Sequence, residues 1–140
     1  MKKVIKRLYQ LYKTYDPFEL AERKNIIVQF EPLGSILGYY SFHKRVQFIH
    51  INEQLEENMQ RLVCAHELGH AILHPKVNTS FLKKNTFFSI DKLEMEANLF
   101  AVELLMPDEY LYELNNTSIT LREAAAMYGV PKEIVHLKNF

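Results

Sequence analysis

The sequence has little of what marks secreted, membrane-bound or strongly charged proteins. Only one of its 140 residues is cysteine, Cys64, so no disulfide can form within the chain and a reducing compartment is expected. Lysine and arginine total 17, as do aspartate and glutamate, and this balance argues against non-specific binding to nucleic acid or anionic membranes. The sequence shows neither a signal-peptide pattern nor an apolar run of about 18 residues. We therefore expect a cytoplasmic protein.

The chain also lacks repeats, low-complexity segments and linkers rich in glycine, serine or proline. Hydrophobic residues make up 48% of it and charged residues 24%, as in ordinary globular domains. A chain of 140 residues is long enough to bury a core. We predict a single domain over residues 1–140.

Helices and a few strands follow one another in this predicted domain. Apolar spacing predicts a helix over 3–14, and Asp16 followed by Pro17 marks the start of a second helix. The β-branched and aromatic segments 26–33 and 36–51 predict two or three antiparallel strands. Later helices, separated by a polar loop at 75–90, are expected from Asn52 to about 74, from about 91 to 106, at 107–114, from 121 to Gly129 and from Pro131. The pattern predicts an α+β fold with helices packed on a small antiparallel sheet.

The most informative segment is His66-Glu67-Leu68-Gly69-His70. Residues four apart lie one above the other on a helix, so His66 and His70 can hold one metal ion between them. Glu67 lies next to them around the helix axis, where its carboxylate can act as general base on a water molecule. Two surface histidines on a helix, without any role in metal binding, would show the same sequence pattern. The apolar surroundings and Gly69, which leaves room for close packing, favour the metal site.

The helix expected at 91–106 offers a third ligand. Glu94 and Asn98 share one face with small and apolar residues, whereas Glu96 and Glu103 share the opposite face and are expected to be solvated. Glu94 can complete the site, because two histidines alone leave a zinc site incomplete. Asn98, one turn later, can orient a ligand through a hydrogen bond. Alternatively, Glu94 serves only to cap its own helix together with Asp91.

The segments HELGHAILH and EMEANLFAVELLMP together resemble the ImmA/IrrE family of metallopeptidases, over roughly residues 15–135. That family pairs HELGH with E-x-x-A-N-x-F-A-x-x-L-L-M-P, and both halves match here. The resemblance implies a zincin-like helical domain with one zinc ion on His66, His70 and Glu94, and with Glu67 as the catalytic acid and base. It also implies an endopeptidase of phages and mobile elements that cleaves a helix-turn-helix-type repressor and so relieves repression. Some relatives serve stress responses instead.

Several other residues leave alternatives open. His74, one turn after His70, fits a supporting or helix-capping role better than a ligand role, because the glycine and histidine of the metzincin pattern are missing. Cys64 is expected to be a buried core thiol. A site with two histidines and one carboxylate also accepts manganese, iron or cobalt. The sequence does not rank the residues that could steady an oxyanion, which are His43, His50, Tyr110 and Tyr112.

The C-terminal segment 117–140 has helix-turn-helix spacing, with Gly129 at the turn. A DNA-reading second helix should be long and basic, yet this one offers only two lysines and one histidine. We therefore expect a structural helix pair that belongs to the domain, and no direct contact with nucleic acid. Two other functions stay open, a DNA-binding regulator and a metal-bound binding module without hydrolysis. The base at position 67 favours the enzyme.

Substrate docking has two candidate surfaces in the sequence. The aromatic pair Phe87-Phe88 lies in the polar loop, and exposed aromatic side chains are common anchors at protein interfaces. The strand pair within 36–51 can present an edge to which an extended substrate segment adds as a strand.

Overall fold

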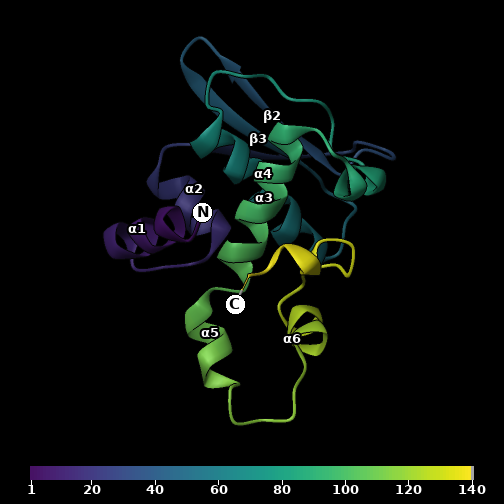
Figure 1. Cartoon of the computed structure of the whole chain (residues 1–140). Coiled ribbons are helices and arrows are strands. Elements are labelled where there is room, and N and C mark those ends of the chain that lie inside the picture. The colour runs from purple at the N-terminus through teal and green to yellow at the C-terminus, as the bar shows by residue number, and fades with distance from the viewer. Residues whose placement is uncertain (140) are drawn as a thin grey trace.

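The computed structural model describes residues 1–139 and has the expected α+β architecture (Figure 1). The helices are α1 (Lys2–Tyr12), α2 (Pro17–Arg23), α3 (Glu57–Leu73), α4 (Lys92–Leu105), α5 (Asp108–Glu113) and α6 (Leu121–Met127). The short 3-10 helices are η1 (Lys84–Phe88) and η2 (Val135–Leu137), and the strands are β1 (Ile27–Glu31), β2 (Gly38–His43) and β3 (Val46–Asn52). Within residues 1–139, no helix has the length and apolar character needed to cross a membrane.

Three helices begin at the capping residues that the sequence predicts. Asp16 accepts a hydrogen bond from the backbone of residue 18, and Pro17 is the first residue of α2. Asp91 caps α4, because its side chain accepts hydrogen bonds from the backbone N–H groups two and three residues later. Thr120 and Glu123 form a reciprocal capping box at α6. These bonds satisfy N–H groups that have no partner inside a helix.

The three strands form one mixed sheet in the order β1-β3-β2. Strands β2 and β3 pair antiparallel, as expected, but β1 pairs with β3 in parallel, so the prediction of a wholly antiparallel sheet is wrong. The physical reason is burial: β3 carries Ile49 and Ile51, which have no exposed surface, whereas most of β1 is exposed. The strand with the most buried residues takes the centre of the sheet, and β1 and β2 are its two edges.

Helix α3 begins later than the sequence predicts. Asn52 is the last residue of β3, and α3 starts at Glu57. The Asn52 side chain donates to the carbonyl oxygens of Gly34 (2.9 Å) and Ile36 (3.1 Å), and accepts from the backbone of residue 54. Asn52 therefore ties the loop between β1 and β2 to the end of β3 and does not cap a helix.

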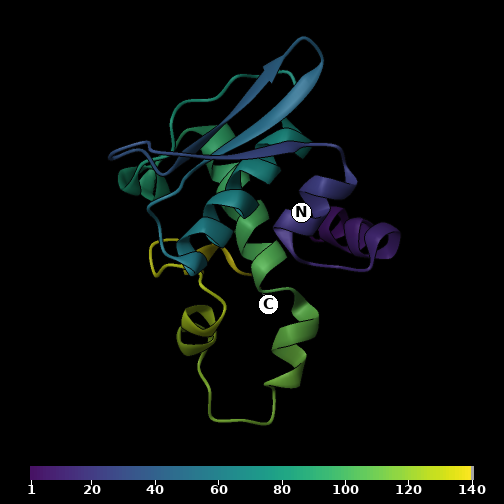
Figure 2. The same ribbon diagram turned by 180° about the vertical axis from the view of Figure 1, so that it is seen from behind.

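Helix α3 runs through the middle of the molecule, between the sheet and α4 (Figures 1 and 2). Its residues 62–71 are all buried. At Gly69 the two helices approach closely, because a Cβ atom there would lie 3.1 Å from the Phe100 ring of α4. This contact lets α3 and α4 hold functional side chains within reach of one another.

The C-terminal segment does not form the expected helix pair. α6 has seven residues and is followed by a turn in which Gly129 has a φ of 75°. From Pro131 the chain forms turns and then the three-residue η2, and not a regular helix. Val130 and Ile134 are buried, so the segment folds back onto the core and cannot extend away as a DNA-reading helix would.

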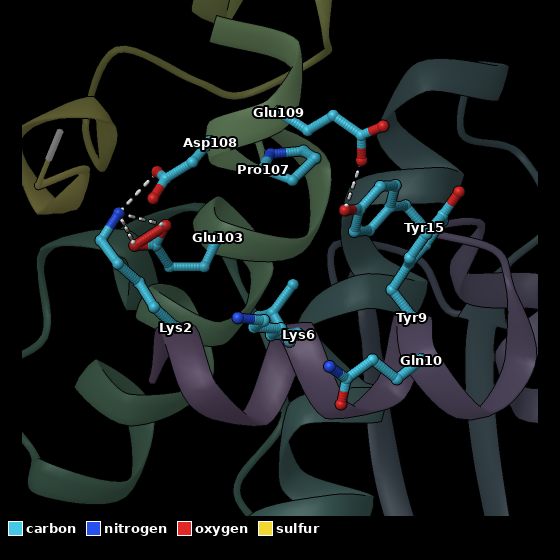
Figure 3. A pocket seen from close by; sticks show the side chains of 10 residues that line it. Lys2, Lys6, Tyr9, Gln10, Tyr15, Glu103, Pro107, Asp108 and Glu109 are labelled. Atoms are coloured by element: carbon cyan, nitrogen blue, oxygen red, sulfur yellow. Dashed lines mark hydrogen bonds and ion pairs between the residues drawn. The ribbon is translucent and has the colours of Figure 1, made fainter. Parts of the chain in front are cut away.

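Glu103 is buried, and the expectation that it is solvated is wrong. Its carboxylate pairs with the ammonium of Lys138 near the end of the chain, and lies 3.3 Å from that of Lys2. Both lysines also pair with Asp108, at 2.6 Å from Lys2 and 2.8 Å from Lys138. Figure 3 shows Lys2, Glu103 and Asp108 at one end of a cavity of about 330 Å³ between α1 and the start of α5. The side of α4 opposite Glu94 therefore carries a buried carboxylate that pairs with lysine side chains from both ends of the chain.

Candidate metal centre

Helices α3 and α4 bring His66, His70 and Glu94 into one buried cluster. Both histidines have no exposed surface, and 7% of Glu94 is exposed. Glu94 Oε1 lies 2.5 Å from His70 Nε2 and 3.6 Å from His66 Nε2. His66, Glu67 and His70 each offer one potential ligand atom, and these atoms lie within 4.8 Å of one another. The spacing of the motif along α3 is thus realised as one compact group.

Several polar atoms of this group have no hydrogen-bond partner among residues 1–139, although they are buried. They are His66 Nε2, both carboxylate oxygens of Glu67 and Glu94 Oε2. Buried polar atoms in folded proteins are nearly always paired, because leaving them unpaired costs free energy. A cation among these nitrogen and oxygen atoms would satisfy them. Imidazole and carboxylate are the ligands of zinc and similar divalent metals, so the residues present fit a metal ion.

A second set of contacts orients the two histidines. Asn98 Oδ1 lies 2.9 Å from His66 Nδ1, so Nδ1 donates to it and Nε2 is left with its lone pair toward Glu94. The Nδ1 atoms of His70 and His74 are 3.2 Å apart, and His74 Nε2 lies 3.6 Å from a carboxylate oxygen of Glu96. His74 is thus next to His70 on the side away from Glu94.

The two carboxylates of the site have opposite pKa shifts. Burial raises the pKa of Glu67 to about 8; the nearby His70 opposes this rise and the Glu94 carboxylate adds to it. Burial would also raise the pKa of Glu94, but the hydrogen bond with His70 and the electrostatic interaction with both histidines outweigh it and lower the pKa to about 2. Glu94 is therefore suited to remain an anion, while Glu67 is suited to take up and release a proton near neutral pH.

Other residues that the sequence singles out have separate contacts. Cys64 is a buried free thiol, and burial raises its pKa well above the usual value, so it is unreactive. His43 is exposed. His50 is held by Glu31 and by Ser41, whose Oγ lies 3.0 Å from the ring. Two tyrosines complete the set: Tyr110, which packs edge-on against Tyr15, and Tyr112, which is 66% exposed.

The two predicted docking surfaces are only partly available. Phe88 is 69% exposed, but Phe87 is buried, since η1 turns it into the core. The outer edge of β2 is partly covered by residues 78–82: Leu82 pairs with Gly38, and the Asn78 side chain accepts from the backbone of Phe42 at 2.7 Å. Phe88 is thus exposed in this loop, as is Phe81, which is 50% exposed.

With this geometry established, comparison with known proteins decides the family. Residues 21–138 match the peptidase M78 family model, which is described as the IrrE N-terminal-like domain. The chain belongs to this family. It is 47% identical over 140 residues to "Uncharacterized immunity region protein 2" of Bacillus phage phi105, which covers 99% of this chain and 89% of that protein. It is 31% identical over 142 residues to "Metallopeptidase ImmA" of Bacillus subtilis (strain 168), covering 99% and 83%.

These relatives confirm the resemblance to the ImmA/IrrE metallopeptidases that the two motifs indicate. The matched range begins within α2 and includes the sheet, both site helices and the C-terminal segment through Lys138. The M78 chain is therefore a metallopeptidase by family, and its buried His–Glu–His group is a suitable place for the metal ion.

Proposed function

We propose that this chain is a zinc-dependent endopeptidase that cleaves a helix-turn-helix-type repressor at few bonds and so relieves repression of a phage or mobile element. The observation that carries the proposal is the buried group His66, Glu67, His70 and Glu94, with polar atoms that lack partners within the described part of the chain, residues 1–139. Two relatives, one named a metallopeptidase and one a phage immunity region protein, support the activity and the setting.

The proposed metal ligands are the Nε2 atoms of His66 and His70 and the carboxylate of Glu94. These three groups converge from two helices and include a carboxylate that stays charged. Asn98 orients His66 by accepting a hydrogen bond from His66 Nδ1. His74 contacts the Nδ1 atom of His70, on the side away from Glu94. Zinc is the proposed metal, and manganese, iron and cobalt fit the same ligands.

The reaction is peptide-bond hydrolysis, with Glu67 as the group that moves the proton. When bound, zinc supplies Lewis acidity, which makes water more acidic and polarises a carbonyl group. Glu67 takes the proton of the attacking water and then delivers it to the leaving amine. Its raised pKa suits both halves of this cycle, because a group that titrates near neutral pH can accept and release a proton. Its burial keeps bulk water from competing for that proton.

A narrow substrate range fits the structure of this small domain. The phage immunity name of one relative supports a repressor as the substrate. Selectivity would then come from docking of a folded partner near the site, for which Phe88 is available. Direct contact with nucleic acid is not part of the proposal, since the segment after Pro131 forms turns and a 3-10 helix in place of a long basic helix.

The decisive experiment combines metal analysis with cleavage of the repressor encoded beside the gene. We expect one zinc ion per chain and one or a few discrete repressor fragments. Glu67→Gln is the matched control, which should keep zinc and yield no fragments. Digestion of casein at many positions with an intact repressor would contradict the proposal. Capture of the repressor without any cleavage by the wild-type protein would identify a binding module instead.

A further inference from the structure

A groove lies between α1 and the start of α5, on the side of α4 opposite Glu94. It consists of two adjoining cavities, of about 330 Å³ and about 290 Å³, and the first of them is the cavity in Figure 3. The two cavities share Tyr9, Tyr15 and Glu109 as lining residues. Cavities of this size are large enough to hold side chains of a bound segment.

Most of the exposed wall of the first cavity is apolar, and its aromatic part is held in place. Ile5 and the rings of Tyr9 and Tyr15 line it. The two tyrosine rings stack with their centroids 4.4 Å apart, and Tyr15 packs edge-on against Tyr110 at 5.4 Å. The Tyr15 hydroxyl also donates to Glu109 at 2.8 Å. Rings fixed in this way lose little freedom when a partner binds, and tyrosine is common among the residues that contribute most to interfaces.

The acidic side chains of the groove already have contacts within the chain. Glu103 and Asp108 pair with lysine side chains. Glu109 accepts from Tyr15, and Asp16 caps α2. A cationic ligand would therefore have to compete with these contacts.

Helix α1 gives the groove an excess of positive charge. Residues 1–13 contain five of the 17 basic residues of the chain and none of its 17 acidic residues. Lys6 lines the first cavity and Lys13 lines the second. Exposed charge of one sign attracts and orients a partner of the opposite sign. Four of the five basic residues are exposed and form no ion pair within residues 1–139: Lys3, Lys6, Arg7 and Lys13.

We propose that this groove is a docking site for an acidic segment of the repressor, with an apolar side chain of that segment in the first cavity and its acidic side chains beside Lys6 and Lys13. This docking site rests on the proposed function, because the segment that it holds belongs to the substrate. A protein segment with an apolar anchor uses both the cavity and the cations. DNA, the other common partner of basic helices, would match the cations through its phosphates and leave the apolar wall uncovered.

The groove is close enough to the metal centre for one repressor molecule to reach both. Glu103, in the groove wall, and Glu94, at the metal centre, are on the same helix, about 14 Å apart along its axis. A folded domain of 100 residues has a radius of gyration of about 13 Å. Docking in the groove would thus hold the repressor while another segment of it lies at the metal.

The test measures cleavage of the repressor encoded beside the gene by the zinc-loaded full chain. Lys6→Glu combined with Lys13→Glu should raise KM about 10-fold at low salt, and should change kcat much less. At about 0.5 M salt the rise in KM should shrink, because salt screens exposed charges. Arg122→Glu combined with Lys132→Glu makes the same change in net charge at exposed positions outside the groove lining, and should behave as the wild type does.

A crosslinking experiment identifies the docked segment without relying on activity. A photo-crosslinking amino acid replaces Gln10, an exposed residue of the groove lining. We expect it to label one repressor segment in which acidic residues flank an apolar residue. An operator DNA fragment used as the probe in place of the repressor should not be labelled.

The two measurements separate this docking site from the proposed function. Equal KM values for the groove variant and its charge-matched control would overturn the docking site, while cleavage by both would leave the proposed function intact. A label on a basic repressor segment, or on the DNA fragment, would overturn the docking site as well. If the wild type labels the acidic segment but leaves every repressor bond intact, the docking site is supported and the proposed function is wrong. If the repressor is neither cleaved nor labelled, both are rejected.

Discussion

Asn98 Oδ1 accepts a hydrogen bond from His66 Nδ1 at 2.9 Å, and this contact turns His66 Nε2 toward Glu94. Asn98 lies one helical turn after Glu94, so α4 supplies both a proposed ligand and the group that orients a ligand of α3. Any shift of α4 along α3 would disturb both contacts at once. The close approach at Gly69 holds the two helices against such a shift.

The contact of Asn98 with His66 predicts an effect on metal affinity. Asn98→Leu removes the acceptor and should weaken zinc binding by about 10- to 100-fold, as measured by competition with a chelator. Asn98→Asp keeps an acceptor oxygen and should retain most of the affinity. Asn116→Ala, in the exposed loop after α5, serves as the control. Equal zinc affinity of Asn98→Leu and the control would show that the contact does not support the metal.

The proposed ligand set predicts which substitutions remove the metal. His66→Ala, His70→Ala and Glu94→Ala should each abolish stoichiometric zinc, because each removes one of three ligands. Glu96→Ala is the matched control on the same helix, since Glu96 contacts His74 and lies outside the cluster. Elemental analysis of the purified variants checks the prediction. Loss of zinc from Glu96→Ala together with its retention in Glu94→Ala would reverse the assignment of helix faces.

The proposed role of Glu67 predicts that its substitution affects hydrolysis but not zinc binding. Glu67→Gln should keep the fold and the zinc ion, because the residue is not a proposed ligand. Hydrolysis of the repressor should fall by several orders of magnitude, as expected when the proton acceptor is removed. Cleavage rates and zinc content are measured on the same preparation. Full cleavage by Glu67→Gln would reject this mechanism.

The clustering of these candidate side chains could be predicted from the sequence because much of its geometry is local. His66, Glu67 and His70 are within one helical turn, and Glu94 and Asn98 are within another, so helical periodicity alone sets each group. Helical periodicity does not show that these two helices pack against each other. That pairing was predicted from the family pattern, which contains both motifs.

The expectations that were wrong concern contacts between distant segments. Glu103 is on the side of α4 opposite Glu94, which periodicity treats as the solvent side, yet Lys138, 35 residues later, covers it. The direction of β1 depends on which strand becomes central, and that is decided by burial of the whole sheet.

The different burial of Phe87 and Phe88 predicts different effects of the two alanine substitutions. Phe88→Ala should weaken cleavage of the folded repressor far more than hydrolysis of a short peptide that spans the cut site, without loss of stability. Phe87→Ala should instead destabilise the protein by about 3 kcal/mol, since it leaves a cavity in the core. Thermal unfolding and the two cleavage assays separate these effects. Equal effects of Phe88→Ala on repressor and peptide would exclude Phe88 as a docking anchor.

Lys138 and Glu103 form a buried ion pair, so removal of the Lys138 charge should destabilise the protein more than removal of an exposed charge. Lys138→Met leaves Glu103 buried, and within residues 1–139 its remaining partner is the more distant Lys2, at 3.3 Å. Removal of one member of a buried pair costs about 3–5 kcal/mol, and Lys2 should reduce this to about 2–3 kcal/mol. Urea unfolding measures the loss, with the exposed Lys132→Met as the matched control.

A double variant distinguishes a lost ion pair from lost packing at the same position. Glu103→Leu combined with Lys138→Met removes both charges, so it should recover most of the stability that Lys138→Met loses, because no unpaired carboxylate remains buried. If the double variant is less stable than Lys138→Met, the packing of these side chains, and not their charge, holds the C-terminal segment onto α4. If Lys138→Met is as stable as Lys132→Met, the pair contributes nothing, and Val130 and Ile134 anchor the segment by apolar burial alone.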